Sequence, residues 1–263
     1  MPRSDPLMAT VIDEVAIEVC VDSAASAVAA QRGGATRIEL CSDLAAGGIT
    51  PSAGLIELVR SKVSIAIHVM IRPRGGDFCY SRDEFEIMRR DIALVKSLGA
   101  NGVVLGLLHT NGSVDADRTR ELADSARPHQ VTFHRAFDVS SDLFRALEDV
   151  CSTGADRILT SGGEQNALQG AALISRLVQA SHGRIIIMAC GGITEKNASS
   201  IVTQTGVREV HAGLRTPVAA LQSPPRIALG TDPRRAYQRY EVLEEDVRSL
   251  REALTFTRTK SGK

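Results

Sequence analysis

The chain has 263 residues, with 31 basic and 31 acidic side chains, so its formal net charge is zero. This balance argues against a protein that coats nucleic-acid phosphates or anionic membranes, because such binding depends on an excess of positive charge. Aromatic residues make up only 3% of the sequence, which disfavours base stacking as well. We therefore expect neither nucleic acid nor a membrane as a partner.

The sequence carries no pattern typical of membrane insertion or export. No stretch approaches the roughly 18 uninterrupted apolar residues of a spanning helix, and residues 1–10 lack the apolar run of a signal peptide. The five cysteines include no CxxC pair, a pattern typical of reduced intracellular thiols rather than of a disulfide framework. We therefore expect a soluble, cytoplasmic protein.

A short glycine-led motif recurs along the chain. It starts at Gly34, Gly99, Gly154 and, more loosely, Gly206, and each copy continues into an apolar stretch. Glycine suits the left-handed turn that ends a helix, and the apolar stretch suits a buried parallel strand. The copies are separated by about twice the roughly 30 residues that one strand and one helix need. Four copies at this double spacing predict eight strands.

The remaining elements follow in chain order between these copies. Further strands are predicted at residues 16–20, 64–72, 130–136 and 184–189. Helix starts are indicated by four sets of capping residues, namely Asp22, Thr50 with Pro51, the capping box of Ser81 with Glu84, and Thr194. Residues 215–234 are rich in proline and polar side chains, which predicts a long loop, and a final helix is expected at residues 233–254.

This regular alternation predicts an α/β fold, a single (β/α)8 TIM barrel that spans residues 1–263 as one domain. Residues 1–12 are expected to form a flexible N-terminal tail, and residues 257–263 a frayed C-terminal one. An open, doubly wound sheet is the alternative, because alternation of strands and helices does not by itself prove that the sheet closes.

Strand alternation also predicts which side chains face the barrel interior. The apolar positions should face the helices, which leaves an unusually polar inward set: Glu18, Cys20, Arg37, Glu39, Cys41, His68, Met70, Arg72, Thr132, His134, Glu209 and His211. Buried charges are costly unless they are paired. One explanation is a set of internal salt bridges, in which Arg37 and Arg157 pair with Glu18 and Glu209. Polar groups nearer the carboxyl ends of the strands favour a functional site, because barrel enzymes build their sites there.

Several of these groups predict an anion-binding mouth. Arg72 and Arg74 end the third strand, and arginine forks suit carboxylate or phosphate. Glycine turns after strands six and seven offer backbone N–H groups to the same anion, at Gly162, Gly191 and Gly192. His134, on the inner face of strand five, could serve as a general acid or base. The alternatives are a salt bridge from the arginines to Asp77 or Asp138, a core histidine, and ordinary tight turns.

The segments EVCVDSAASA, RIELCSDLAAGGITPS, MIRPRGGDFCYS, VTFHRAFD, RILTSGG and EVH occur in this order between Glu18 and His211. In order and spacing they resemble the CutC family of copper homeostasis proteins. The resemblance covers most of the chain and implies a (β/α)8 barrel, a cytosolic role in copper tolerance or trafficking, Cu(I) binding by cysteines, and a homo-oligomer. The MACGGIT and HAGLRT segments depart from the pattern common among relatives, which affects only the rim at strands seven and eight.

Cys20 and Cys41 are the candidate metal ligands. They end strands one and two, which are neighbours in a barrel, and the alternation of side chains along each strand places both on the inward face. Two thiolates can hold Cu(I), which prefers soft ligands, and Met70 could add a thioether. The alternatives are two small buried hydrophobic side chains or a disulfide. Zinc is disfavoured, because no inward histidine or second cysteine pair is expected to complete a tetrahedral set.

Three functions remain open from the sequence. The first is Cu(I) binding in copper homeostasis. The second is an enzyme of unknown reaction that acts on a small phosphorylated or carboxylated metabolite, with Glu39 or His134 as acid or base and no organic cofactor. The third is a non-catalytic scaffold that has kept the barrel.

Overall fold

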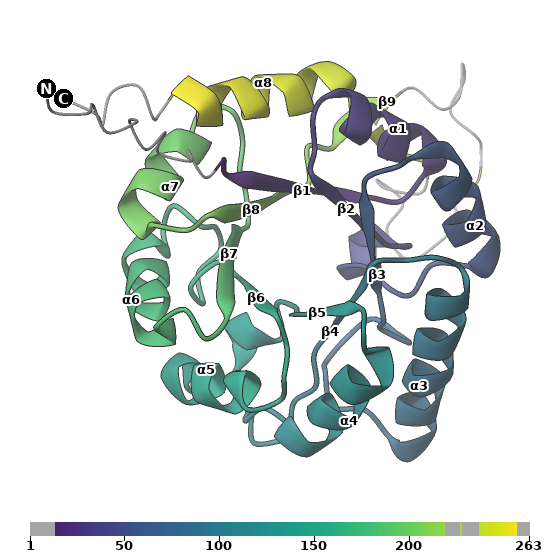
Figure 1. Cartoon of the computed structure of the whole chain (residues 1–263), viewed down its shortest axis with the longest axis vertical. Coiled ribbons are helices and arrows are strands. Elements are labelled where there is room, and N and C mark those ends of the chain that lie inside the picture. The colour runs from purple at the N-terminus through teal and green to yellow at the C-terminus, as the bar shows by residue number, and fades with distance from the viewer. Residues whose placement is uncertain (1–13, 219–226, 228–236, 257–263) are drawn as a thin grey trace, which may run out of the picture.

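The computed structural model describes residues 14–218, 227 and 237–256, and within them the strands β1 to β8 form a closed parallel barrel (Figure 1). Each strand pairs with its neighbours in chain order, and β8 pairs with β1 to close the sheet. The strands are β1 (Ala16–Val21), β2 (Arg37–Leu40), β3 (Ala66–Met70), β4 (Gly102–Leu105), β5 (Gln130–Phe133), β6 (Arg157–Thr160), β7 (Ile186–Cys190) and β8 (Glu209–Ala212). The (β/α)8 prediction is confirmed, and the open sheet is excluded.

Helices surround the barrel, and Figure 1 shows α8 closing the ring between α7 and α1. They are α1 (Ala24–Arg32), α2 (Ala53–Lys62), α3 (Arg82–Ser97), α4 (Ala116–Ala126), α5 (Leu143–Cys151), α6 (Ala171–Ser181), α7 (Ala198–Thr205) and α8 (Glu244–Phe256). Two short 3-10 helices, η1 (Leu44–Ala46) and η2 (Phe137–Val139), lie in the loops after β2 and β5. None of the helices in the described residues is long and apolar enough to cross a membrane.

The helix starts agree with the sequence in one case and differ in three. The capping box of Ser81 with Glu84 is present at α3. The side chain of Ser23, not Asp22, caps α1, and Ser52, just after Pro51, caps α2. Thr194 does not cap α7, which begins after Asn197 and has no side-chain cap; the Asn197 side chain instead accepts from the backbone N–H of Thr194. In α1 and α2 the difference arises because a neighbouring serine reaches the free N–H groups of the first turn.

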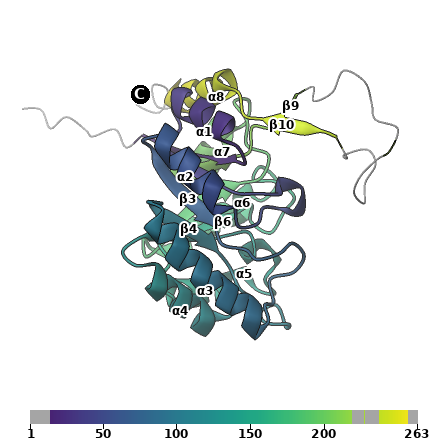
Figure 2. The ribbon, with the colours of Figure 1, turned by 90° about the vertical axis from the view of Figure 1, so that its right-hand side faces the viewer.

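The segment after β8 is more ordered at its ends than expected. Strand β9 (Thr216–Val218) pairs antiparallel with β10 (Arg239–Glu241), and Figure 2 shows this pair projecting from one end of the barrel. The last helix therefore begins at Glu244, well after the predicted start at residue 233. Most of the predicted loop, both predicted tails and the predicted start of the last helix lie outside the described residues.

The barrel separates an apolar outer layer from a polar interior. Ile17, Val19, Ile38 and Leu40 belong to the main hydrophobic core, which joins the strands to the helices. The side chains between them point inward, as predicted, and this arrangement places charged groups on the barrel axis.

The lower part of this interior contains the predicted ion pairs. Arg37 Nε lies 2.5 Å from Glu18 Oε2, and Arg37 Nη2 lies 2.6 Å from Glu209 Oε2. Arg157 Nε lies 3.1 Å from the same Glu209 oxygen. Arg37 and Arg157 thus each have a carboxylate partner, which offsets the cost of removing the charges from water.

Candidate functional site

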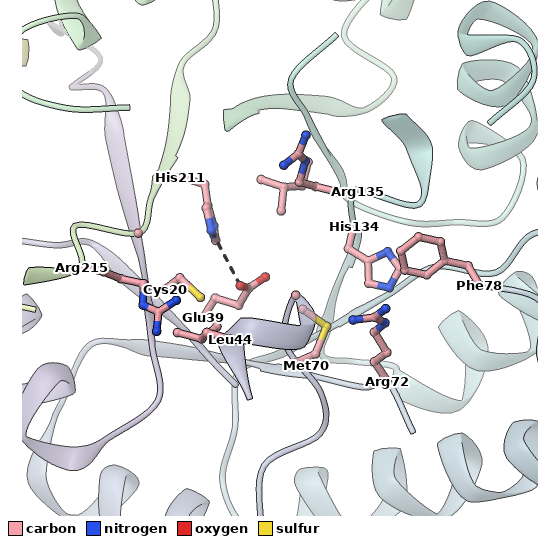
Figure 3. A pocket seen from close by; sticks show the side chains of 13 residues that line it. Cys20, Glu39, Leu44, Met70, Arg72, Phe78, His134, Arg135, His211 and Arg215 are labelled. Atoms are coloured by element: carbon pink, nitrogen blue, oxygen red, sulfur yellow. Dashed lines mark ion pairs between the residues drawn. The ribbon is translucent and has the colours of Figure 1, made fainter. Parts of the chain in front are cut away.

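A cavity of about 220 Å³ opens at the carboxyl ends of the barrel strands (Figure 3). It is lined by Cys20, Glu39, Leu44, Gly47, Met70, Arg72, Phe78, His134, Arg135, Leu159, His211, Gly213 and Arg215. Four predicted site residues therefore share one cavity, namely Cys20, Glu39, Arg72 and His134. A volume this small suits a metal ion or a small metabolite rather than an extended ligand.

The two candidate cysteines are neighbours at one end of this cavity. Cys20 pairs in register with Glu39, and Cys41 follows two residues after Glu39, directly beyond the end of β2. Their sulfur atoms lie 3.8 Å apart, well beyond the roughly 2.05 Å of a disulfide, and both thiols are free. Met70 and Val104 pack against them in a small cluster separate from the main core. The predicted proximity of the two thiols is confirmed.

His211, which the sequence argument left without a role, completes a second set of donors. One ligand atom each from Cys20, Glu39 and His211 all lie within 4.8 Å of one another. This finding corrects the argument against zinc, because an inward histidine does lie beside the cysteine. Strand alternation in the EVH segment already predicted that the His211 side chain faces inward. Only the closing contact between β8 and β1, which aligns His211 with Glu18, brings it to Cys20.

The imidazole of His211 is held by two carboxylates of the barrel interior, Glu18 and Glu39. Its Nδ1 donates to Glu18 Oε1 at 2.7 Å, and its Nε2 lies 3.8 Å from Glu39 Oε2. Burial alone would lower the pKa of His211, but Glu39, Cys20 and Glu18 together raise it well above its usual value. Burial would likewise raise the pKa of Glu18, but Arg37 and His211 hold it far below its usual value. The pair is therefore ionised at neutral pH.

The two thiols differ in their acidity. The hydrogen bond with Cys41 lowers the pKa of Cys20 to about 5, against the opposing effect of burial, and His211 adds to the lowering. The same hydrogen bond, together with burial, raises the pKa of Cys41. Burial and the charge of Cys20 also raise the pKa of Glu39 well above its usual value. Cys20 is thus the thiolate of the pair, and the thiolate is the form that binds metal.

The other end of the cavity is formed by Arg72, His134 and Phe78, which lie together in Figure 3. Burial and the charge of Arg72 lower the pKa of His134 to about 3, so the imidazole is neutral at neutral pH. Its Nδ1 accepts a hydrogen bond from the backbone N–H of Ala136 at 3.2 Å, so Nε2 carries the proton. His134 is therefore built as a hydrogen-bond donor.

Arg74 does not share this cavity, although the sequence predicted that both arginines would. Its Nε lies 2.5 Å from Glu84 Oε1 and its Nη2 lies 3.1 Å from Asp77 Oδ1, outside the cavity lining. The alternative of a salt bridge to Asp77 is thus confirmed for this residue. Asp77 lies in the segment that leads into α3 and Glu84 in the first turn of that helix, and they draw the guanidinium away from the barrel mouth.

The glycine turn after β6, which was predicted to bind an anion, is occupied by a side chain of the protein itself. Asp138 Oδ1 accepts from the backbone N–H groups of Ser161 at 3.0 Å and Gly163 at 3.1 Å, and from Thr160 Oγ1 at 2.5 Å. Gly162 directs its own N–H to Thr160 Oγ1. The sequence predicted that this turn would help to bind a ligand anion, whereas in the structure it holds an internal carboxylate.

The glycine turn after β7 is also closed to the cavity. The Cα of Asn166 packs over Gly191 and its Cβ over Gly192, so that an added Cβ would meet them at 3.2 and 3.4 Å. Neither glycine lines the cavity. Of the five predicted anion-binding residues, only Arg72 lies in the cavity.

Comparison with known proteins agrees with this fold. The family model of the CutC family matches residues 15–216. A CutC family protein of Chromobacterium violaceum is 45% identical over 90% of this chain and 97% of its own length. A human protein named copper homeostasis protein cutC homolog is 50% identical over 76% of this chain and 73% of its own length. The crystal structure of a CutC protein from Streptococcus agalactiae superposes with a TM-score of 0.71 at 33% identity, covering 75% of this chain and 98% of that one.

Fold and site together define a closed (β/α)8 barrel with thiol, carboxylate and imidazole groups in one cavity at its C-terminal face. The family match covers most of the chain, and the two relatives named above are 45% and 50% identical to it. The chain belongs to the CutC family.

Proposed function

We propose that the protein binds Cu(I) through Cys20 and Cys41 and serves copper homeostasis. Its human and mouse relatives carry that role in their names. The observation that carries the proposal is the 3.8 Å separation of two free, buried sulfur atoms on adjacent strands. Two soft donors at such a distance can both reach one Cu(I) ion, which tolerates a low coordination number.

The surroundings of the pair suit a soft, singly charged ion. Cys20 is the thiolate, and Met70 packs against both cysteines as a third soft group. His211 lies beside Cys20, and a metal that bound its imidazole would have to displace the proton that the neighbouring carboxylates favour. A cavity shared with Glu39 gives the ion a path to solvent, which a protein that passes copper on requires.

The protein is proposed to act in the cytoplasm as a homo-oligomer. Its five cysteines are free in the structure, which fits a reducing compartment. The oligomer rests on the family resemblance, and sedimentation of the purified protein tests it. A monomer at all accessible concentrations would contradict this part of the proposal.

The copper proposal is tested by Cu(I) titration of the reduced protein against a competing chelator. The Cys20→Ser, Cys41→Ser double variant should lose high-affinity binding. Cys190→Ser is the matched control, because Cys190 is also a buried, free cysteine of the barrel interior but packs with Leu159 and Met188. Equal affinity in the parent and the double variant would refute the assignment.

A second candidate function is an enzyme that acts on a small anionic metabolite. Glu39 favours it, because its Oε1 is buried with no hydrogen-bond partner among the described residues, and burial raises the pKa of its carboxyl, as suits a general acid. A thermal-shift screen of phosphorylated and carboxylated metabolites, run beside the copper titration, separates the two. A protein stabilised by neither class would be a scaffold.

A further inference from the structure

Arg72 differs from the other buried arginines of the barrel interior. Arg37 and Arg157 each contact a carboxylate, whereas no ion pair found among the described residues includes Arg72, although only 4% of its surface is exposed. Burying a positive charge without a counter-ion is costly. Arg72 therefore provides a positive charge that the described part of the chain leaves uncompensated.

The guanidinium of Arg72 is nevertheless held firmly in place. Its Nη1 donates to the backbone carbonyls of Ala46 at 2.8 Å and Gly48 at 3.0 Å, and its Nη2 donates to that of Gly76 at 2.7 Å. Carbonyl groups orient the side chain without neutralising it. Two N–H groups remain, Nε–H and the second N–H of Nη2, and Nε is buried with no hydrogen-bond partner among the described residues. A buried donor that lacks a partner is unfavourable, so the arrangement predicts an external acceptor.

His134 presents a second donor of the same kind. It is 4% exposed, and its Nε2–H is buried without a partner in the described part of the chain. The ring of Phe78 covers both groups, at 4.9 Å from the Arg72 guanidinium carbon and 4.9 Å from the His134 ring centre. Figure 3 shows the imidazole and the guanidinium side by side, and both line the cavity.

We propose that Arg72 and His134 form a subsite for the carboxylate group of a small metabolite. The buried Nε–H of Arg72 and Nε2–H of His134 match the two oxygens of a carboxylate, and the guanidinium carries the balancing positive charge. A phosphate has more oxygens to satisfy, whereas three of the four Nη N–H groups of Arg72 already donate to backbone carbonyls. The neutral state of His134 leaves one positive charge for one negative charge.

The rest of such a ligand would extend toward the other end of the cavity. Cys20, Glu39 and His211 line it together with Arg72 and His134. The subsite gives the second candidate function a substrate class and rests on the cavity rather than on copper. A carboxylate bound there would have its remaining atoms in the part of the cavity that Glu39 and Cys20 line.

The test uses the full-length, reduced, copper-free protein and three probes: acetate, malonate and inorganic phosphate. Each is titrated against a chloride control of equal ionic strength, and the thermal midpoint is followed. The carboxylates should raise the midpoint saturably, and phosphate should not. Arg72→Met should weaken carboxylate binding by roughly tenfold or more, because it removes a hydrogen bond to a charged group.

Two further variants keep the result interpretable. His134→Phe removes the second donor but preserves the ring and every hydrogen bond of Arg72 to the carbonyls, so it tests the subsite even where Arg72→Met fails to fold. Arg74→Met is the matched control, because this neighbouring arginine lies outside the cavity and should bind carboxylates like the parent.

The inference is overturned if neither carboxylate stabilises the parent, if phosphate alone does, or if His134→Phe binds as well as Arg74→Met. The Cys20→Ser, Cys41→Ser double variant separates this inference from the copper proposal. It should lose copper and keep carboxylate binding. A loss of both would show that the carboxylate is held by the thiol end of the cavity.

Discussion

His211 on the last strand of the barrel donates a hydrogen bond from Nδ1 to Glu18 Oε1 on the first strand, at 2.7 Å. The contact spans 193 positions of the chain and links the charged floor of the barrel to the cavity. Glu18 is itself held by Arg37, so the orientation of the imidazole depends on a chain of three charged groups. A carboxylate behind a histidine is also the arrangement that orients metal-binding imidazoles in other proteins.

Replacing Glu18 by Gln should lower the pKa of His211. The substitution removes one of the carboxylates that now raise it against the effect of burial. The pKa can be followed by NMR titration of the imidazole in the copper-free protein. A pKa as high as in the parent would mean that Glu39 and Cys20 suffice to hold the proton.

Replacing Arg37 by Met should destabilise the fold by about 3–5 kcal/mol, because Glu18 loses its closest cation and Glu209 loses one of two. Denaturant-induced unfolding measures the change. Arg184→Met provides the control, because the pair of Arg184 with Glu148 is largely solvent-exposed and its loss should destabilise the fold far less. Similar losses in both variants would rule out a structural role for the interior ion pairs.

Stability should fall in acid partly because of His68. Burial lowers its pKa from 6.5 to about 3 in the folded protein, so the unfolded chain takes up a proton first as the pH falls. Above pH 6.5 the imidazole is neutral in both states and costs no stability. Between about pH 6.5 and 3 the free energy of unfolding falls by up to about 1.4 kcal/mol per pH unit because of this proton. A His68→Gln variant should show a shallower decline of unfolding free energy over this window. An unchanged slope would assign the acid sensitivity to other groups, among them His134.

The two overlapping donor sets around Cys20 should respond differently to substitution. Cys41→Ser should weaken Cu(I) binding far more than Zn²⁺ binding, because it removes one of two soft donors. His211→Ala should do the reverse, because zinc accepts mixed sulfur, nitrogen and oxygen ligands. Parallel chelator competition with both ions measures the effect. Equal losses for both metals in both variants would indicate one common site.

Local physical rules account for much of what the sequence predicted. The glycine-led repeat and the capping box are short-range patterns, and both correspond to elements of the structure. The interior ion pairs could be predicted from the alternation of side chains along the strands, since an inward-facing charge needs a partner. The helix starts at Ser23 and Ser52 were misplaced by one or two residues, because adjacent polar side chains compete for the same N–H groups.

What the sequence by itself determined is the order of the strands and the face on which each side chain lies. Neighbouring strands in the chain are neighbours in the barrel, so the proximity of Cys20 and Cys41 could be deduced. Only the tertiary structure decided which distant groups meet. Closure of the sheet brought His211 to Cys20, Asp138 filled the β6 turn, and Glu84 drew Arg74 out of the mouth. Parity and strand order follow from the local geometry of the backbone, whereas these three contacts depend on how loops and strands far apart in the chain pack together.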